Sequence, residues 1–579
     1  MTPSSRIVRL RRVAATVLAL ALASAMLLLI PGRALAGCAD KVRTFPAGQL
    51  ERGMRGHGLT VVKGREPAPF SIRILGVLRD GAGPGLDIIV VKGGGKAVRA
   101  SGGFAGGFSG SPVYIDGRLV GSLSYGFGDP YYGGLTPAKN LVSILRTGSS
   151  PKAAREVVLP DALRRLIARD SGTPLRATGT TLRTLPLPLA VSGVPAGHLD
   201  EVQARFAAQG IDVIPYVAGA AAARRIPIEA KAPQPGDVFV AAQSYGAVTY
   251  AGIGTATLSC GNRVVAFGHL FAHAGGGRSA AMMGGKVITV VPTDGPYPGY
   301  KLANVGSLLG SITQDRYTGV MGAAGVEPLL ATLRSTVHNT DLDRRTVATT
   351  QVATPRYVAY IAWEHVYTAL HVGLDDHNGT VRFSWRVTGV ADGRRFSTRM
   401  HNLYSGGSVL YEPAGDVEQS IRTIERSAGK VTISAVRMHA VVQGAVRKAR
   451  VEAAKTWSNT ESIFAKQRVL RVHRGDEVRV RIPVVPRNGD PTRIARVVFT
   501  VPQRVTEDGT LVIKVGEPSY ETRHGGFRQV LYRLRNQPTN EDLFLRFKMK
   551  GMEHSVKVTL PQGYDLRGHL RDVHLEFVG

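Results

Sequence analysis

The chain has 579 residues, of which 44% are hydrophobic and 20% charged, and its formal net charge is +30. This length exceeds a single ordinary core, so several domains are expected, and the composition excludes both a disordered chain and a polytopic membrane protein. The basic residues are spread along alternating strands and do not gather in helices beside stacking aromatics. This distribution argues against a nucleic-acid partner.

The first 36 residues predict an export signal. A basic start is followed by an apolar run, Val13–Ile30, and then by Ala34-Leu35-Ala36, which has the small-residue pattern of a cleavage site. A retained N-terminal anchor is the alternative, because the apolar run is long enough to cross a bilayer. We therefore expect an exported protein, secreted or associated with the cell envelope, whose positive charge favours an anionic envelope surface as a partner.

The chain contains two cysteines, Cys38 and Cys260. In an exported protein two cysteines are most simply interpreted as one disulfide, which would tie the mature N-terminus to a strand far along the chain. The alternative is that Leu35-Ala36-Gly37-Cys38 is a lipoprotein box, in which Cys38 carries a lipid.

The first lobe, residues 37–150, is predicted to be a small β-barrel, with short strands near 59–63, 70–78, 86–92, 112–115 and 118–125. Before the fourth strand stands Gly107-Phe108-Ser109-Gly110-Ser111-Pro112. A serine nucleophile needs a tight glycine turn that exposes its oxygen and directs backbone amides at a developing oxyanion. Ser109 is therefore the candidate nucleophile, and the amides of Gly107 and Ser109 are the candidate oxyanion hole. The alternative is an ordinary glycine-rich loop.

Residues 151–236 predict an α/β insertion and a linker, and residues 237–325 a second β lobe. In that lobe an apolar strand ends at Gly268-His269. Histidine is the side chain best suited to take a proton from a serine near neutral pH. No metal site and no cofactor are expected, because His273, the nearest second histidine, has no further ligand close by in the sequence.

With both blocks present, residues 50–325 resemble the stage IV sporulation protein B serine peptidase family, which carries a Gly-x-Ser-Gly-Ser-Pro block and a Gly-His block after a strand. The resemblance implies a two-lobed, trypsin-like β-barrel domain with its site between the lobes. It further implies that Ser109 is the nucleophile, that His269 is the general base, and that the substrate is a protein or peptide.

Two features depart from that family. The serine block precedes the histidine block, and the position of the family's acidic residue, fifteen before the serine, is occupied by Gly94. Asp87 is the nearest acid that could take its place beside His269, although an aspartate at the start of a strand is also typical of a turn. A backbone carbonyl or the Ser122 hydroxyl is the alternative partner of the histidine ring.

The rest of the chain predicts a mixed α/β accessory region, 326–430, and a β-sandwich-like domain, 431–579. Asp416 and Gln419 are interpreted as the capping pair that starts a helix. The expected fold is mainly β throughout. The expected function is an exported serine endopeptidase; the alternative is a catalytically weak or inactive peptidase-fold protein that acts as an envelope binding or scaffold module. The sequence makes no prediction of the oligomeric state.

Overall fold

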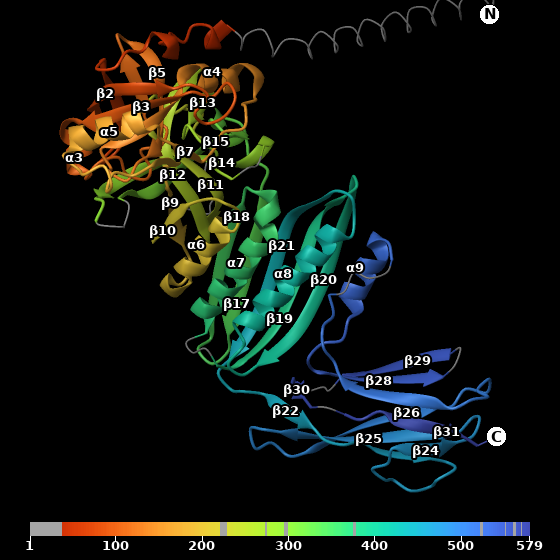
Figure 1. Ribbon diagram of the computed structural model, residues 1–579. Coiled ribbons are helices and arrows are strands. Elements are labelled where there is room, and N and C mark those ends of the chain that lie inside the picture. The colour runs from red at the N-terminus through yellow and green to blue at the C-terminus, as the bar shows by residue number, and fades with distance from the viewer. Residues whose placement is uncertain are drawn as a thin grey trace, which may run out of the picture.

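The computed structural model describes residues 37–579 except 220–227, 273–274, 295–298, 375–377, 521–524, 550–551, 560–562, 569 and 579. The export signal and His273 lie outside the described residues. The fold is mainly β, as predicted, and runs from two barrels through a helix-covered sheet to a sandwich (Figure 1). No helix within the described ranges is long and apolar enough to cross a membrane.

The first barrel is a closed antiparallel sheet. Its strands follow the order β4-β1-β2-β3-β6-β5, and pairing of β4 with β5 closes the ring. The serine block lies between the short helix α3 (Gly95–Ala100) and β4. The strands are β1 (Arg55–Thr60), β2 (Ala68–Leu78), β3 (Ile88–Gly94), β4 (Pro112–Ile115), β5 (Arg118–Gly126) and β6 (Tyr132–Pro137), and α4 (Ala138–Thr147) follows them.

The second barrel closes in the same way, in the order β12-β13-β16-β15-β14-β11 with β11 paired to β12. His269 follows β13. The two-lobed β-barrel architecture is thereby confirmed. The strands are β11 (Val238–Gly246), β12 (Thr249–Cys260), β13 (Arg263–Ala266), β14 (Gly275–Val291), β15 (Tyr300–Arg316) and β16 (Gly319–Ala324).

The segment expected as one insertion divides between the barrels. Its first part, β7 (Glu156–Val158), α5 (Asp161–Ser171) and β8 (Thr181–Thr184), extends the first barrel because β8 pairs with β5. Its second part is a small α/β unit on the second barrel, in which β9 (Leu187–Ser192) pairs with β12 and β10 (Val213–Val217) lies parallel to β9 beside α6 (Leu199–Ala207).

A disulfide joins Cys38 to Cys260, across 222 positions of sequence, and confirms the predicted pairing. It connects the segment before the first barrel to the end of β12. Because the Cys38 sulfur is used in this bond, the same sulfur cannot carry a lipid.

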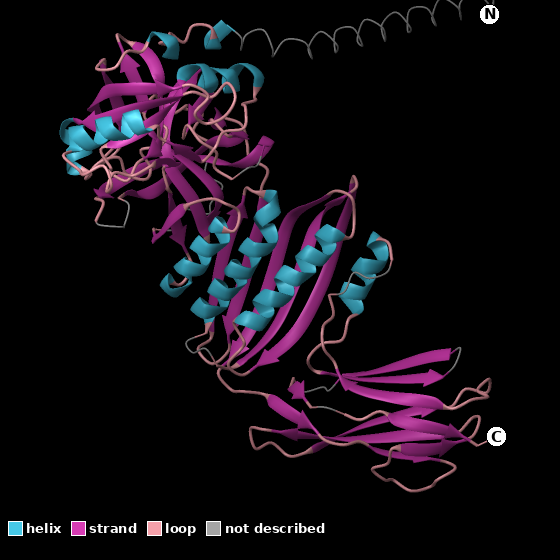
Figure 2. Cartoon of the chain, in the orientation of Figure 1, coloured by secondary structure: helices cyan, strands magenta, loops and turns pink. Residues whose placement is uncertain are grey.

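The middle region forms a five-stranded sheet that continues the second barrel, since β18 pairs with β11. Helices α7 (Val358–Gly373) and α8 (Tyr411–Arg426) lie on one face of it (Figure 2). Its order is β18-β17-β21-β19-β20, from β17 (Ala331–Asn339), β18 (Arg344–Val352), β19 (Thr380–Ala391), β20 (Arg394–Ser405) and β21 (Val431–Gln443).

Two predictions in this region were wrong. The boundary at 430/431 falls before β21, which pairs with both β17 and β19 and therefore belongs to the middle sheet. Asp416 does not cap a helix; it lies inside α8, where its carboxylate accepts hydrogen bonds from Asn402 and from the Tyr404 hydroxyl. That tertiary contact outweighs the local capping signal.

The C-terminal region is a two-sheet sandwich, as predicted, whose inward positions alternate with exposed ones along each strand. One sheet contains β22 (Lys448–Val451), β23 (Lys455–Ser458), β25 (Glu477–Pro486), β26 (Arg493–Thr500) and β30 (Asp565–Arg567). The other contains β24 (Val469–Val472), β27 (Gly509–Val515), β28 (Asp542–Met549), β29 (Met552–Thr559) and β31 (Val573–Phe577). Helix α9 (Phe527–Asn536) packs beside β20.

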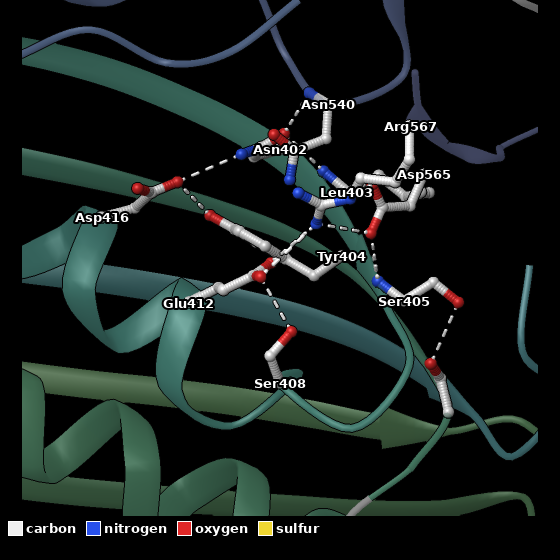
Figure 3. A network of polar contacts seen from close by, with 11 residues as sticks. Asn402, Leu403, Tyr404, Ser405, Ser408, Glu412, Asp416, Asn540, Asp565 and Arg567 are labelled. Carbon is white, nitrogen blue, oxygen red and sulfur yellow. Dashed lines mark hydrogen bonds and ion pairs between the residues drawn. The ribbon is translucent and has the colours of Figure 1, made fainter. Parts of the chain in front are cut away.

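A polar clamp fastens the sandwich to the middle sheet (Figure 3). The fully buried Asp565 accepts a hydrogen bond from the Ser405 N–H at 3.2 Å. Arg567 bridges Asp565, at 3.0 Å, and Glu412 of α8, at 3.4 Å. From β20, which also carries Ser405, the Asn402 side chain accepts a hydrogen bond from the Asn540 N–H at 2.8 Å. We refer to these residues as the clamp.

Candidate active site

The serine block forms a tight loop, residues 105–111, which we call the serine loop. Gly107 and Gly110 adopt φ angles of 85° and 97°, in the left-handed region that favours glycine. A Cβ atom on Gly110 would lie 1.9 Å from the carbonyl oxygen of Thr255 on β12. The loop therefore needs glycine at this position both for its backbone conformation and for its close approach to the second barrel.

The amides of this loop alternate in their bonding. The N–H groups of Gly106, Phe108 and Gly110 donate to backbone carbonyls, whereas no described residue accepts a hydrogen bond from the N–H of Gly107 or Ser109. Buried backbone amides are almost always paired, so two unpaired ones in one loop require an explanation. They are the two amides that the sequence predicts for the oxyanion hole.

Anchored carbonyls fix the direction of these two amides. The Gly106 carbonyl accepts the Lys301 N–H at 2.9 Å, and the Phe108 carbonyl accepts both the N–H and the hydroxyl of Ser111, at 2.9 Å and 2.6 Å. A trans peptide is planar and its N–H points opposite to its C=O. Each anchored carbonyl therefore holds the following N–H, of Gly107 or Ser109, on the other side of the loop.

The histidine block is a strained turn after β13. The Gly268 N–H donates to the Ala266 carbonyl at 2.9 Å, which makes a three-residue turn with Phe267 at its centre, at a φ angle of 67°. A left-handed conformation costs a non-glycine residue roughly 1–2 kcal/mol. The Phe267 ring compensates by packing against Gly254, and it lies parallel to the His269 ring at 6.0 Å.

The environment of His269 suits a base. Its Nδ1 lies 2.8 Å from the Leu270 carbonyl oxygen, so Nδ1 carries the proton that it donates there and Nε2 keeps its lone pair. Burial lowers the pKa of His269 below its ordinary value, and the opposing effects of the Leu270 carbonyl and of Asp315 do not reverse this. The imidazole is therefore neutral at pH 7.

The two blocks meet although they come from different barrels. The Thr255 N–H donates to the Ser109 carbonyl at 2.9 Å, and the Phe267 N–H donates to the Thr255 carbonyl at 3.3 Å. The side-chain oxygen of Ser109 and Nε2 of His269 are both buried, and neither has a hydrogen-bond partner among the described residues. The structure thus brings the two blocks to the same junction, where the Ser109 hydroxyl and Nε2 of His269 are not hydrogen-bonded to each other.

Asp87 does not join them. Its carboxylate bonds to Arg79 at 3.0 Å, to Lys139 at 3.5 Å and to the Asp80 N–H at 3.2 Å, all on the first barrel or its helix. Burial alone would raise the pKa of Asp87, but these partners outweigh it and lower the pKa below its ordinary value. The position beside Nδ1 belongs to the Leu270 carbonyl, the kind of partner given as the alternative.

Neither Gly94, at the position of the family's acidic residue, nor Ser122 provides a partner for the His269 ring. Gly94 ends β3 at the start of α3, where a Cβ atom would meet the Ser71 hydroxyl at 3.0 Å. The Ser122 hydroxyl accepts a hydrogen bond from the Thr257 hydroxyl at 3.2 Å, and Ser122 lies against Gly268. It makes no hydrogen bond to the described atoms of His269.

Three residues of the site were not anticipated from the sequence. Lys301 is fully buried, and its ammonium donates to the hydroxyls of Thr60 at 2.8 Å and Thr255 at 2.9 Å, which joins the two barrels. Thr255 in turn donates to the Gly107 carbonyl at 2.9 Å. Asp315 accepts the N–H groups of the two residues that follow Leu270 and so fixes the chain beyond the histidine.

A cavity of about 180 Å³ opens beside His269, between segments of both barrels. Arg155, Asp212 and Tyr317 are among its lining residues, and burial raises the pKa of the Asp212 carboxyl. Ser109 does not line it and has an exposed fraction of 0%. A substrate carbonyl can therefore reach Ser109 only after the segments around it move.

Comparison of the chain with family models, with curated proteins and with solved structures finds no match. Across the described ranges, no group of His, Cys, Asp or Glu side chains is arranged to hold a metal ion. The serine loop and the histidine turn are therefore the features of the molecule that point to a function.

Proposed function

We propose that the protein is an exported serine endopeptidase of the kind that the sequence resembles. The observation that carries the proposal is the packing of the serine loop against the histidine turn at the junction of the two barrels, where the Ser109 oxygen and Nε2 of His269 are both buried and have no hydrogen-bond partner among the described residues, each other included. The two unpaired amides of the serine loop add to it. Unsatisfied buried groups are costly and cluster where a ligand or reaction supplies their partner.

In the proposed reaction the Ser109 oxygen attacks a peptide carbonyl carbon while Nε2 of His269 takes the hydroxyl proton. The amides of Gly107 and Ser109 donate to the oxyanion. Collapse of the tetrahedral intermediate breaks the C–N bond, and the leaving amine takes the proton from His269. Water, deprotonated by the same nitrogen, then hydrolyses the acyl-enzyme. The Leu270 carbonyl orients the ring but supplies no negative charge, so turnover is expected to be slow.

The test is labelling of the purified protein by a fluorophosphonate, which reacts with activated serines. We expect labelling of wild type and its loss in Ser109→Ala and in His269→Ala. Ser101→Ala is a matched control, because Ser101 is a buried serine of the same barrel that bonds only to the Ala97 carbonyl. Absence of labelling in well-folded wild type would refute the proposal.

Two observations favour the second candidate, an inactive peptidase-fold module of the envelope. Ser109 is fully buried, and no carboxylate of the described residues is hydrogen-bonded to the histidine ring. In that case Ser109→Ala would leave the biological function of the protein intact, whereas the peptidase proposal requires its loss. We also propose an anionic envelope surface as a partner; the net charge of +30 is its support.

A further inference from the structure

The middle sheet has one open face of unusual composition. Helices α7 and α8 cover the other face, and the outward residues of the open face are exposed or half-buried. None of the strands β17 to β21 contains Asp or Glu. This face is separate from the candidate active site, since no residue of the serine loop or the histidine turn belongs to it.

Four arginines form a straight row across this face. Arg334 is paired with Arg437, Arg437 with Arg386, and Arg386 with Arg399, on four neighbouring strands. All four are exposed, and none forms an ion pair with a described residue. We call them the arginine row. Adjacent strands lie about 4.8 Å apart, so the row places the Cα atoms of its arginines at about that spacing.

Such a row costs stability. Like charges at directly opposite positions of neighbouring strands repel one another. A fold gains nothing from three such pairs in succession without an intervening carboxylate, so a ligand that neutralises them is the simplest explanation.

The flanking rows indicate which chemistry the ligand has. On one side lie His439, His401 and Ser384, and on the other Thr332, Thr388 and Ser397. Hydroxyl and imidazole donors beside guanidinium groups suit phosphate oxygens, which accept several hydrogen bonds each. No aromatic side chain occupies the outward positions of these rows, so base stacking is not available, and few aliphatic ones do, so there is little to insert into a bilayer.

We propose that the open face of the middle sheet binds a linear phosphate polymer along the arginine row. The spacing favours phosphate over an acidic peptide. An extended peptide presents side chains to one side only every second residue, at about 6.8 Å, which is wider than the row. A chain of linked phosphates carries charge densely enough to meet every guanidinium group.

The test uses long-chain inorganic polyphosphate as the probe and measures its affinity for the purified full chain by fluorescence anisotropy at several salt concentrations. Arg386→Gln/Arg437→Gln removes the two central charges of the row. We expect the affinity to fall about tenfold or more, and the slope of log K against log salt to fall by about 2. The thermal midpoint should rise, because the repulsion is relieved.

The sandwich supplies a matched control. Arg481 and Arg496 are also exposed and directly paired on neighbouring strands, so Arg481→Gln/Arg496→Gln removes the same charge elsewhere. We expect it to leave polyphosphate binding unchanged. An equal loss of polyphosphate affinity in both double variants would show that binding depends on net charge and not on the arginine row, and would overturn the proposal. Tighter binding of poly-glutamate, of single-stranded DNA or of phosphatidylglycerol vesicles than of polyphosphate would also overturn it.

Discussion

Replacing Lys301 with methionine should change how stability depends on pH. Burial lowers the pKa of Lys301 from its ordinary 10.5 to about 7. Among the described residues, no charged side chain forms an ion pair with its ammonium: the hydroxyls of Thr60 and Thr255 accept its hydrogen bonds from β1 and β12, and the Phe108 ring of the serine loop lies 5.3 Å away. The difference between these two pKa values corresponds to about 5 kcal/mol of stability that depends on the protonation of Lys301.

The sign follows from proton binding. Between pH 7 and pH 10.5 the unfolded chain keeps the lysine proton while the folded protein releases it, so the free energy of unfolding rises with pH in this window. Relative to Lys301→Met, wild type should gain about 2–3 kcal/mol between pH 7 and pH 9. Well below pH 7 the difference should be constant, because the lysine is then protonated in both states.

The measurement must report on the barrels, because Trp363, Trp385 and Trp457 all lie outside them. We would follow urea unfolding by hydrogen-exchange mass spectrometry of peptides from β12 and β15 at several pH values. Lys286→Met is the control, since Lys286 is an exposed lysine on the neighbouring strand β14. If the difference in free energy of unfolding between wild type and Lys301→Met does not change with pH, the reasoning is refuted.

Three further predictions concern the same domain. Gly110→Ala should destabilise the barrels by more than about 2 kcal/mol and abolish fluorophosphonate labelling, whereas Gly117→Ala, at a similarly left-handed but open position, should cost about 1 kcal/mol and keep labelling; equal effects would contradict the contact with Thr255. Reduction of the Cys38–Cys260 disulfide should cost about 5 kcal/mol in the chain-entropy account, measured by exchange of β12 amides with and without reductant, and unchanged exchange would refute it. Asp87→Asn should lower stability by about 1 kcal/mol at pH 7 and leave labelling intact, and the loss should vanish as the pH falls through the lowered pKa of Asp87; a large loss of labelling would restore its role beside His269.

The sequence predicts the local features of the site well. The alternation of apolar and polar residues predicts the strands of the barrels, because side chains point alternately to the two faces of a sheet and one face is buried. The serine loop is recognisable because Gly107 and Gly110 adopt left-handed backbone conformations that favour glycine, and this requirement is visible in the local sequence. The pairing of Cys38 with Cys260 could be predicted because two cysteines can form only one intramolecular disulfide, although the sequence also allowed a lipoprotein box at Cys38.

Long-range contacts were beyond such reasoning. Lys301 stands between Tyr300 and Leu302 in an ordinary strand pattern, and nothing nearby in the sequence shows that Thr60 and Thr255 will bury its ammonium. The same holds for Asp87, whose partners Arg79 and Lys139 are set by how the first barrel closes. The arginine row likewise exists only once the strand register is known.

The pairing of β18 with β11 has a mechanical consequence. Since strand pairing joins the histidine-bearing barrel to the middle sheet, and the clamp joins that sheet to the sandwich, we expect these three parts to move as one body. The serine-bearing barrel is attached to this body by side-chain contacts, short backbone bridges, the connecting chain and one disulfide. We therefore expect a domain movement that uncovers Ser109 to be a rotation of the first barrel relative to the other three parts of the chain.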